Sequence, residues 1–252
     1  MANVGSEEAA LQARRRRRLM WMAGVAAAAV VAVAVAIAAG SGGGKKGTTT
    51  ASQKPAASGV KGVSAVLSEF NGIPQRSNEL GSPNAKATLM VFADLQCPFC
   101  AQWDTGALPG IVQRYVKPGL LKVVFQPIVI IGNDSVLGAR AAAAAAQQHK
   151  LFEFTGLVYR NQGRENSGYL NNAFVRKIAG AVPGLDAANV IANLKAPPIN
   201  NLLNQAQSLA TTARVNATPT FFVAKRGQPL QQLTATSLTA SGFYPQLDAL
   251  TR

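Results

Sequence analysis

Apolar residues occur along this chain in stretches of three different lengths and periods. Positions 20–39 form one uninterrupted run without a charge, and a stretch rich in Gly, Ser, Thr and Lys follows over 40–62. Shorter apolar runs begin near position 87, and longer segments with helical spacing fill 135–212. The pattern predicts a membrane-length segment, a polar connection and one domain over 63–252 that can bury a core.

The first apolar run has the length of a membrane-spanning helix. At a rise of about 1.5 Å per residue, it extends about 30 Å, the hydrocarbon thickness of a bilayer. Five arginines at positions 14–18 precede it, so the positive-inside rule keeps that end in the cytoplasm. We predict a cytoplasmic basic segment over 1–18 and a single-pass signal-anchor over 19–39. A cleaved signal peptide is the alternative, although its apolar core would be unusually long.

The polar connection and the charge distribution add little chemistry of their own. The composition of 40–62 cannot bury a core and is typical of a flexible linker. The formal net charge is +14, and half of it arises before position 63. The remaining positive charge is scattered, without a basic run and interleaved aromatic residues. We therefore expect no nucleic-acid partner.

Beyond the linker, the pattern predicts an α/β domain. The runs at 87–95 and 120–130 are nearly continuous in apolar residues, as expected of strands buried on both faces. A helix is expected at 101–116, kinked or split at Pro109. Helical segments follow, then a hairpin at 218–234 turning at 225–227, and a closing helix. This order predicts an α/β fold with a helical insertion at about 132–212.

Two cysteines, Cys97 and Cys100, follow the first predicted strand with C-x-x-C spacing. A metal site lacks donors, because the only histidine is His149, which we place on the surface at a helix end. A purely structural disulfide would close a small ring and constrain the unfolded chain little. At a helix start, unpaired N–H groups and the helix dipole would lower the pKa of Cys97. Pro98 suits that first turn, and Cys100 would be more buried, so we expect a redox pair without metal or cofactor.

Two motifs together resemble a known family. The segment FADLQCPFC at 92–100, with VNATPTFFV at 215–223, is similar to the DsbA-like thiol-disulfide oxidoreductases, especially their membrane-anchored bacterial branch. The resemblance extends over about 65–252 and implies a thioredoxin-like fold with a helical insertion. It also implies that Cys97 is the nucleophile and Cys100 the resolving thiol. Thr218 and Pro219 match the cis-proline loop that holds the substrate strand.

The sequence departs from the family pattern at two positions. Many thioredoxin-like proteins carry a buried acid six residues before the first cysteine, where this chain has Val91. Asp94 is the nearest carboxylate, and we expect it to cap the turn rather than to accept a proton through water. The dipeptide between the cysteines ends in Phe99 rather than His. We therefore predict a Cys97 pKa below about 8.5, but a less oxidising pair than in Pro-His enzymes.

Aromatic residues near the motifs suggest a substrate surface. Pro98 and Phe99, together with the cis-proline loop, are the expected substrate contacts. A wider apolar platform would also use Trp103, Phe221 and Phe222. Core packing is the favoured interpretation for Trp103 and Phe221.

The resemblance and the predicted topology together indicate a reaction and a compartment. We expect an extracytoplasmic, monomeric enzyme that oxidises thiols of unfolded or reduced secreted proteins. The family implies a quinone-linked membrane partner that reoxidises it. The direction of exchange depends on potential and partner, so a reductase, an isomerase or a haem-maturation reductase stays open. A membrane-tethered chaperone or binding protein that only retains the fold is the alternative of another class.

Overall fold

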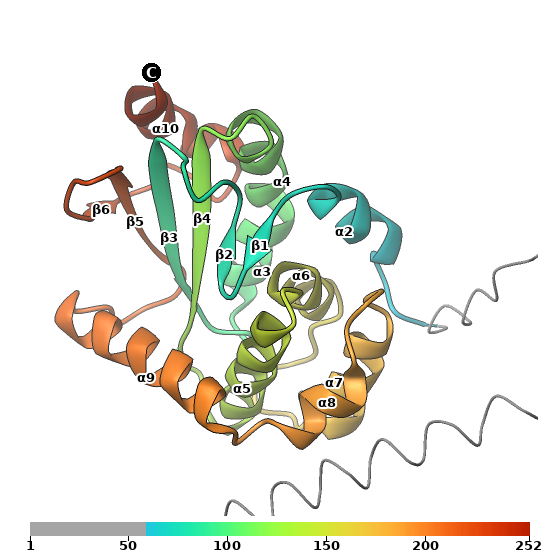
Figure 1. The fold of residues 1–252 in the computed structure, drawn as a ribbon. Helices are drawn as coiled ribbons and strands as arrows, with labels where there is room; N and C mark the ends of the chain where they lie inside the picture. The colour runs from blue at the N-terminus through green and yellow to red at the C-terminus, as the bar shows by residue number, and fades with distance from the viewer. Residues whose placement is uncertain (1–58) are drawn as a thin grey trace, which may run out of the picture. The chain divides into compact units, whose positions relative to one another are not determined.

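The computed structural model of the 252-residue chain describes residues 59–252 (Figure 1). The basic segment predicted for 1–18, the anchor predicted for 19–39 and most of the linker predicted for 40–62 lie outside the described residues. Within 59–252, no helix combines the length and the apolar character that a bilayer crossing requires.

A six-stranded sheet with the order β1-β2-β4-β3-β5-β6 forms the centre of the described part (Figure 1). The two central strands, β3 and β4, run parallel, whereas β5 is antiparallel to β3 and β6 is antiparallel to β5. The strands are β1 (Gln75–Arg76), β2 (Glu79–Leu80), β3 (Ala87–Ala93), β4 (Leu121–Pro127), β5 (Thr220–Lys225) and β6 (Gln231–Leu233).

The central strands confirm the prediction made from the two continuous apolar runs. In register, Val91 of β3 lies between Phe125 of β4 and Phe221 of β5. Both strands are almost wholly buried, which explains why neither alternates between apolar and polar residues. The predicted hairpin is also present, with Gly227 at φ 79° in the turn that follows β5.

Helices surround the sheet and account for most of the remaining residues. The helix expected at 101–116 begins at Pro98, between the two cysteines, and ends at Gly106 before Pro109, as the expected split requires. The helical elements are α2 (Val63–Phe70), α3 (Pro98–Gly106), α4 (Leu108–Ile111), the π-helical turn η1 (Val112–Val116), α5 (Asn133–Gln147), α6 (Leu151–Arg160), α7 (Asn172–Gly180), α8 (Ala187–Ala192), α9 (Pro197–Thr212), the 3-10 turn η2 (Ala240–Gly242) and α10 (Tyr244–Thr251). The helical insertion between β4 and β5 is therefore present as predicted.

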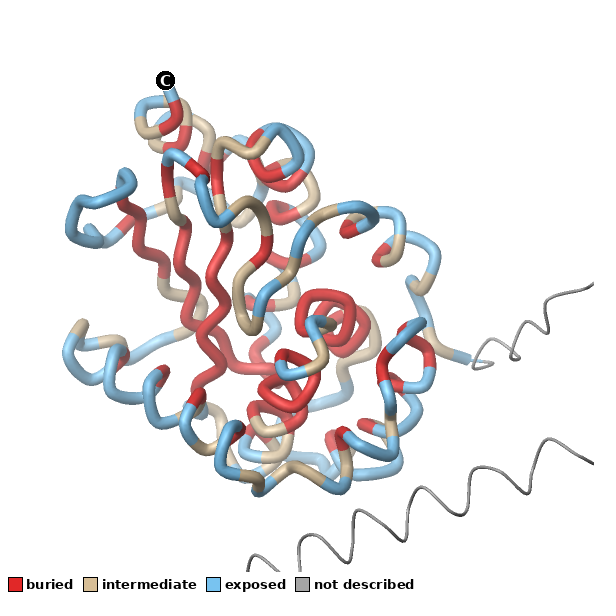
Figure 2. The backbone as a smooth tube through the Cα atoms, in the orientation of Figure 1, coloured by how far each residue is buried: buried red, intermediate tan, exposed pale blue. Residues whose placement is uncertain are grey.

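The core consists of two clusters on opposite faces of the sheet. Buried segments run along β3 and β4 and through α5 and α6 (Figure 2). The smaller cluster lies between the sheet and α9, and it contains Met90, Phe92, Val124, Ile128, Ala206, Ala210 and Phe222. The larger cluster contains Trp103 and Phe221, whose ring centroids are 5.5 Å apart.

This packing shows which residues of the predicted aromatic platform are buried and which are exposed. Trp103 and Phe221 are core residues, as favoured from the sequence. Phe222 is buried as well, so its assignment to a surface platform is wrong. Successive residues of a strand face opposite sides, and α9 covers the side that Phe222 faces. Phe99 alone of the four is exposed, with 60% of its surface accessible.

Candidate active site

The cysteine turn joins the end of β3 to the start of α3. Cys97 is the N-cap residue, with extended backbone angles of φ −70° and ψ 121°, and Pro98 occupies the first helical turn. Because Pro98 has no N–H to leave unpaired and its φ already suits a helix, α3 can begin directly after the cysteine. The expected placement of Cys97 at a helix start is confirmed.

The two sulfur atoms have opposite electrostatic surroundings. A hydrogen bond from the Cys100 thiol, helped by the backbone N–H groups of Phe99 and Cys100, lowers the pKa of Cys97 to about 6, although burial opposes the shift. Burial is the main cause that raises the pKa of Cys100 well above its usual value. Cys97 is therefore ionised near neutral pH, whereas Cys100 holds its proton.

The loop before β5 closes over the first cysteine. The peptide bond between Thr218 and Pro219 is cis, as the family resemblance implies. When it is protonated, the Cys97 thiol donates to the carbonyl oxygen of Thr218 over 3.3 Å. Residues 121 positions apart in the chain thus meet at one sulfur, and the two motifs singled out in the sequence form one site.

Asp94 holds the cysteine turn in place. Its carboxylate is fully buried and accepts four hydrogen bonds. The donors are Gln96 N and Ser135 Oγ for Oδ1, and Ile130 N and Ile131 N for Oδ2, at 2.7–3.0 Å. Because these donors use both oxygens, Asp94 fixes the turn and joins it to the loop after β4, in agreement with the expected capping role.

The loop between α6 and α7 supplies a second support that the sequence did not reveal. Gln162 Nε2 donates to the carbonyl oxygens of Leu95 and Cys97, at 2.9 and 3.1 Å. The side chain of Gln96 bonds to Ser135 and Asn166 nearby. Gln162 lies 65 positions from Cys97 and belongs to no motif, so no local signal could have identified it.

A buried cluster of charged side chains joins α6 to α3 and α2. Arg160 of α6 forms ion pairs with Asp104 of α3 at 3.0 Å and with Glu69 of α2 at 3.1 Å. Burial raises the pKa of Asp104 to about 7 and that of Glu69 to about 8. Sequence analysis also missed this cluster, because an acid four residues after Cys100 looks like any helical surface residue.

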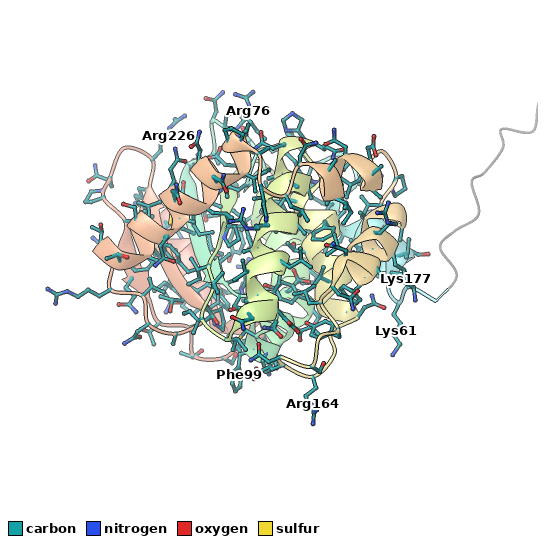
Figure 3. All side chains as sticks on the ribbon, turned by 90° about the horizontal axis from the view of Figure 1, so that it is seen from below. Lys61, Arg76, Phe99, Arg164, Lys177 and Arg226 are labelled. Atoms are coloured by element: carbon teal, nitrogen blue, oxygen red, sulfur yellow. The ribbon has the colours of Figure 1, made fainter. Side chains whose placement is uncertain are left out.

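The surface beside Cys97 is apolar. Pro98 and Phe99 are exposed, and Phe99 points outward on the same side as Arg164 (Figure 3). Val129 and Ile130, each 41% exposed, follow β4, whose carboxyl end adjoins that of β3 because the two strands are parallel. We call Phe99, Val129 and Ile130 the apolar rim.

His149 and the metal alternative can be placed as well. His149 is exposed just after α5, as expected, and its Nδ1 accepts a long hydrogen bond of 3.4 Å from Ser77 N. Within 59–252, no three His, Cys, Asp or Glu side chains come together as a possible metal site.

Comparison with known proteins agrees with the fold and the site. Residues 75–235 match a family described as thioredoxin. A probable disulfide bond formation protein D of Bacillus cereus is 26% identical over 147 residues, which cover 57% of this chain and 68% of that protein. Oxidised BdbD of Bacillus subtilis has a TM-score of 0.61 at 17% identity, covering 71% of this chain and 97% of that structure. A thioredoxin-like oxidoreductase of Silicibacter pomeroyi has a TM-score of 0.54 at 26% identity, covering 73% and 95%.

Proposed function

Because this chain belongs to the thioredoxin family, as a DsbA-like oxidoreductase homologous to the Bacillus disulfide bond formation proteins D, we propose that it oxidises thiols of secreted proteins. Thiol-disulfide exchange is the reaction class of that group, and Cys97 and Cys100 form its C-x-x-C pair. The direction of exchange, the substrates and the compartment are the parts that we propose.

The difference between the two sulfurs is the observation that carries the proposal. With the pair as a disulfide, a substrate thiolate attacks Cys97, and the bonding electrons of the broken S–S bond leave on Cys100. A second substrate thiolate then attacks the substrate sulfur of the mixed disulfide, and Cys97 leaves as a thiolate. The substrate loses two electrons and the enzyme gains them. A Cys97 pKa of about 6 makes this sulfur a good leaving group near neutral pH.

The surroundings of Cys97 fit a substrate in extended conformation. The Thr218 carbonyl lies 3.3 Å from the sulfur, and Pro219 follows it at the entrance of β5. We propose that Thr218 and Pro219 align a substrate strand beside Cys97, and that Pro98 and the apolar rim contact its side chains. Apolar contacts of this kind suit unfolded chains, which expose residues that are later buried.

The Cys97 thiolate supports the proposed direction of exchange. An enzyme whose reduced form is stabilised is an oxidant, because each unit by which the Cys97 pKa is lowered favours the dithiol over the disulfide. We propose that the anchor at 19–39 holds the domain on the extracytoplasmic side of the membrane. We also propose that the protein acts as a monomer. A quinone-linked membrane protein would then accept the two electrons and restore the disulfide.

The equilibrium potential of the full-length chain against glutathione tests the direction. An oxidase of this kind should lie above about −200 mV, yet below the roughly −120 mV of DsbA, since Phe99 supplies no cation. A potential near the −270 mV (approximately) of thioredoxin would instead support a reductase. Oxidation of a reduced peptide should stop in Cys97→Ser; retained biological activity in that variant would support a tethered binding protein.

A further inference from the structure

The end of α6 binds the backbone of the cysteine turn on its carbonyl side. Tyr159, in the last turn of α6, donates its hydroxyl to the carbonyl oxygen of Asp94 over 3.3 Å. Gln162 lies three positions farther along, and its Nε2 donates to the carbonyl oxygens of Leu95 and Cys97 at 2.9 and 3.1 Å. Two side chains at one end of a helix thus hold three carbonyl groups of the cysteine turn.

The partners of Gln162 settle how its amide is oriented. Both groups that it meets are carbonyl oxygens, which only accept, so the nitrogen of the amide faces them. The loop that carries Gln162 brings little net charge to the turn, because Arg164 and Glu165 are both exposed and opposite in sign. Gln162 therefore acts on the turn through its two hydrogen bonds.

The two carbonyl groups that Gln162 binds belong to peptide units that place the Cys97 sulfur. The unit between Leu95 and Gln96 is fixed at both ends, since the N–H of Gln96 donates to a buried carboxylate over 2.9 Å. The Cys97 carbonyl also accepts a hydrogen bond of α3, from Ala101 N at 3.1 Å. Gln162 therefore restrains the backbone both before and after the Cα atom of Cys97.

The backbone conformation of Cys97 determines which groups its sulfur meets. With φ −70° and ψ 121°, this residue keeps its side chain at the helix start, where the backbone N–H groups of Phe99 and Cys100 reach the sulfur. Such N–H groups stabilise an anion, because the helix leaves them unpaired. A rotation about ψ would move the Cys97 carbonyl and the sulfur relative to each other. We propose that Gln162 is a positioning residue for Cys97, and that its two hydrogen bonds keep the sulfur beside the free N–H groups of α3.

This role rests on the proposed function only in that Cys97 is the sulfur that exchanges. No bond forms or breaks at Gln162, and it takes no part in the transfer of electrons. It changes the free energy of the Cys97 thiolate, which attacks a disulfide in one direction of exchange and leaves in the other. The positioning role is therefore independent of the direction of exchange.

Titration of Cys97 in the reduced full-length chain tests the proposal without any substrate. Gln162→Met keeps the length of the side chain and removes both donors. We expect the ionisation constant of Cys97 to fall about tenfold, which raises its pKa from about 6 by about one unit. Thiolate absorbance from pH 4 to 9 measures the pKa. The rate of alkylation by iodoacetamide at pH 6 should fall about fivefold, because the thiolate is the reactive form.

A second substitution at the same position separates positioning from a loss of packing. Gln162→Glu also keeps the length, but its ionised carboxylate cannot donate, and it repels the two carbonyl oxygens and the thiolate. The pKa of Cys97 should therefore rise farther than in Gln162→Met. Gln162→Ala replaces either variant that does not fold, since it only removes a partly exposed side chain, and it should match Gln162→Met.

Gln148 offers a matched control. Its amide also joins a helix end to the backbone of another segment, because Nε2 donates to the carbonyl oxygen of Asp186 at 3.3 Å and Oε1 accepts from Asp186 N at 2.8 Å. Gln148 directly follows α5, about 20 Å along that helix from Ser135, which lies beside the cysteine turn. Gln148→Met should therefore lose hydrogen bonds of the same kind and leave the pKa of Cys97 unchanged.

Three results would overturn the positioning role. The first is an unchanged Cys97 pKa in Gln162→Met, and the second is a pKa in Gln162→Glu that is no higher than in Gln162→Met. The third is an equal rise in Gln148→Met. The proposed function fails separately, if the natural chain does not oxidise a reduced peptide, because the titration involves no substrate.

Discussion

The first and second turns of α3 shift the pKa of ionisable side chains in opposite directions. At the first turn, Cys97 meets free N–H groups and the Cys100 thiol, and its pKa falls to about 6. One turn farther, Cys100 and Asp104 lie in the interior, and burial raises the pKa of both. Two cysteines that are identical in chemistry are thus made unlike by a shift of three residues along one helix.

The comparison shows that the helix end and the protein interior act as separate electrostatic environments. Backbone N–H groups favour an anion only where the helix has not yet paired them, which is the first turn. Farther along, those groups are used within the helix, so desolvation dominates. A C-x-x-C pair straddles this boundary, which gives one sulfur that ionises and one that keeps its proton.

Removing each sulfur in turn produces the largest expected contrast. Cys97→Ser should lose peptide oxidation by more than about 10³-fold, because the attacked sulfur is gone. Cys100→Ser should also fail to turn over, but its remaining Cys97 thiolate should attack a peptide disulfide that carries an aromatic thiol as leaving group, forming a stable mixed disulfide with the peptide as the aromatic thiolate departs. Mass spectrometry of the trapped adduct and a thiol-loss assay measure the two effects.

Equal amounts of trapped mixed disulfide at Cys97 and at Cys100 would contradict the proposed difference between the two sulfurs. The reverse pattern, in which Cys97→Ser is trapped through Cys100, would show that the second sulfur is the reactive one. A reduced protein denatured in urea is the control, since both thiols should then react at similar rates.

Loosening the turn that carries Cys97 should have the next largest effect. Asp94→Asn leaves one amide oxygen and a donor group to meet four donors, so we expect a loss of about 2–3 kcal/mol in the free energy of unfolding. The pKa of Cys97 should rise toward that of a free thiol, because its place at the helix start depends on this turn. Urea unfolding and thiolate absorbance measure the two changes.

Asp134 offers a matched control for that variant. It lies in α5 and is less buried, and its Oδ2 accepts one hydrogen bond, from Gly168 N at 2.8 Å. Asp134→Asn should cost less than about 1 kcal/mol and leave the Cys97 pKa unchanged. Similar losses in both variants would contradict a special role of Asp94 in placing the sulfur.

The two sulfurs should also differ in how their contributions to the free energy of unfolding depend on pH, which is the next largest expected effect. The folded pKa of Cys97 is about 6 against an ordinary value of 9.0, so its contribution is complete above pH 9 and is lost as the pH falls through 6. At pH 7 it is on the order of 1 kcal/mol in the reduced protein. The difference in unfolding free energy between the natural protein and Cys97→Ser should therefore grow from pH 5 to pH 8.

Cys100 should behave differently in the same range. Its pKa is raised in the folded protein, so it stays protonated in both the folded and the unfolded state below pH 8. Because a serine hydroxyl can still donate to the Cys97 sulfur, Cys100→Ser should change stability by an amount that varies little with pH over this range. A slope in Cys100→Ser, or none in Cys97→Ser, would reverse the assignment of the two environments.

Local patterns predicted the fold and the reactive pair, but not the contacts that tune the pair. Continuous apolar runs identified β3 and β4, and the C-x-x-C spacing with a following Pro placed Cys97 at a helix start. Phe222 was misplaced because the sequence of a strand does not show which of its two faces a neighbouring helix, here α9, covers. The Arg160–Asp104 pair lies outside local patterns for the same reason, since its members are 56 positions apart.

Introducing a cation at the first turn of α3 has the smallest expected effect among these tests of the difference between Cys97 and Cys100. Phe99 is exposed, so Phe99→His adds an imidazole beside Cys97 at little expected cost to packing. The protonated ring stabilises the thiolate, and the potential at pH 6 should rise by about 20 mV, or roughly 1 kcal/mol. Cys100, a turn deeper, should keep its pKa.

Phe99→Ala is the control, because it removes the ring without adding charge. The two variants should converge above pH 8, where imidazole is neutral; an equal shift in both at pH 6 would show that the lost aromatic surface, and not charge at the helix start, sets the potential.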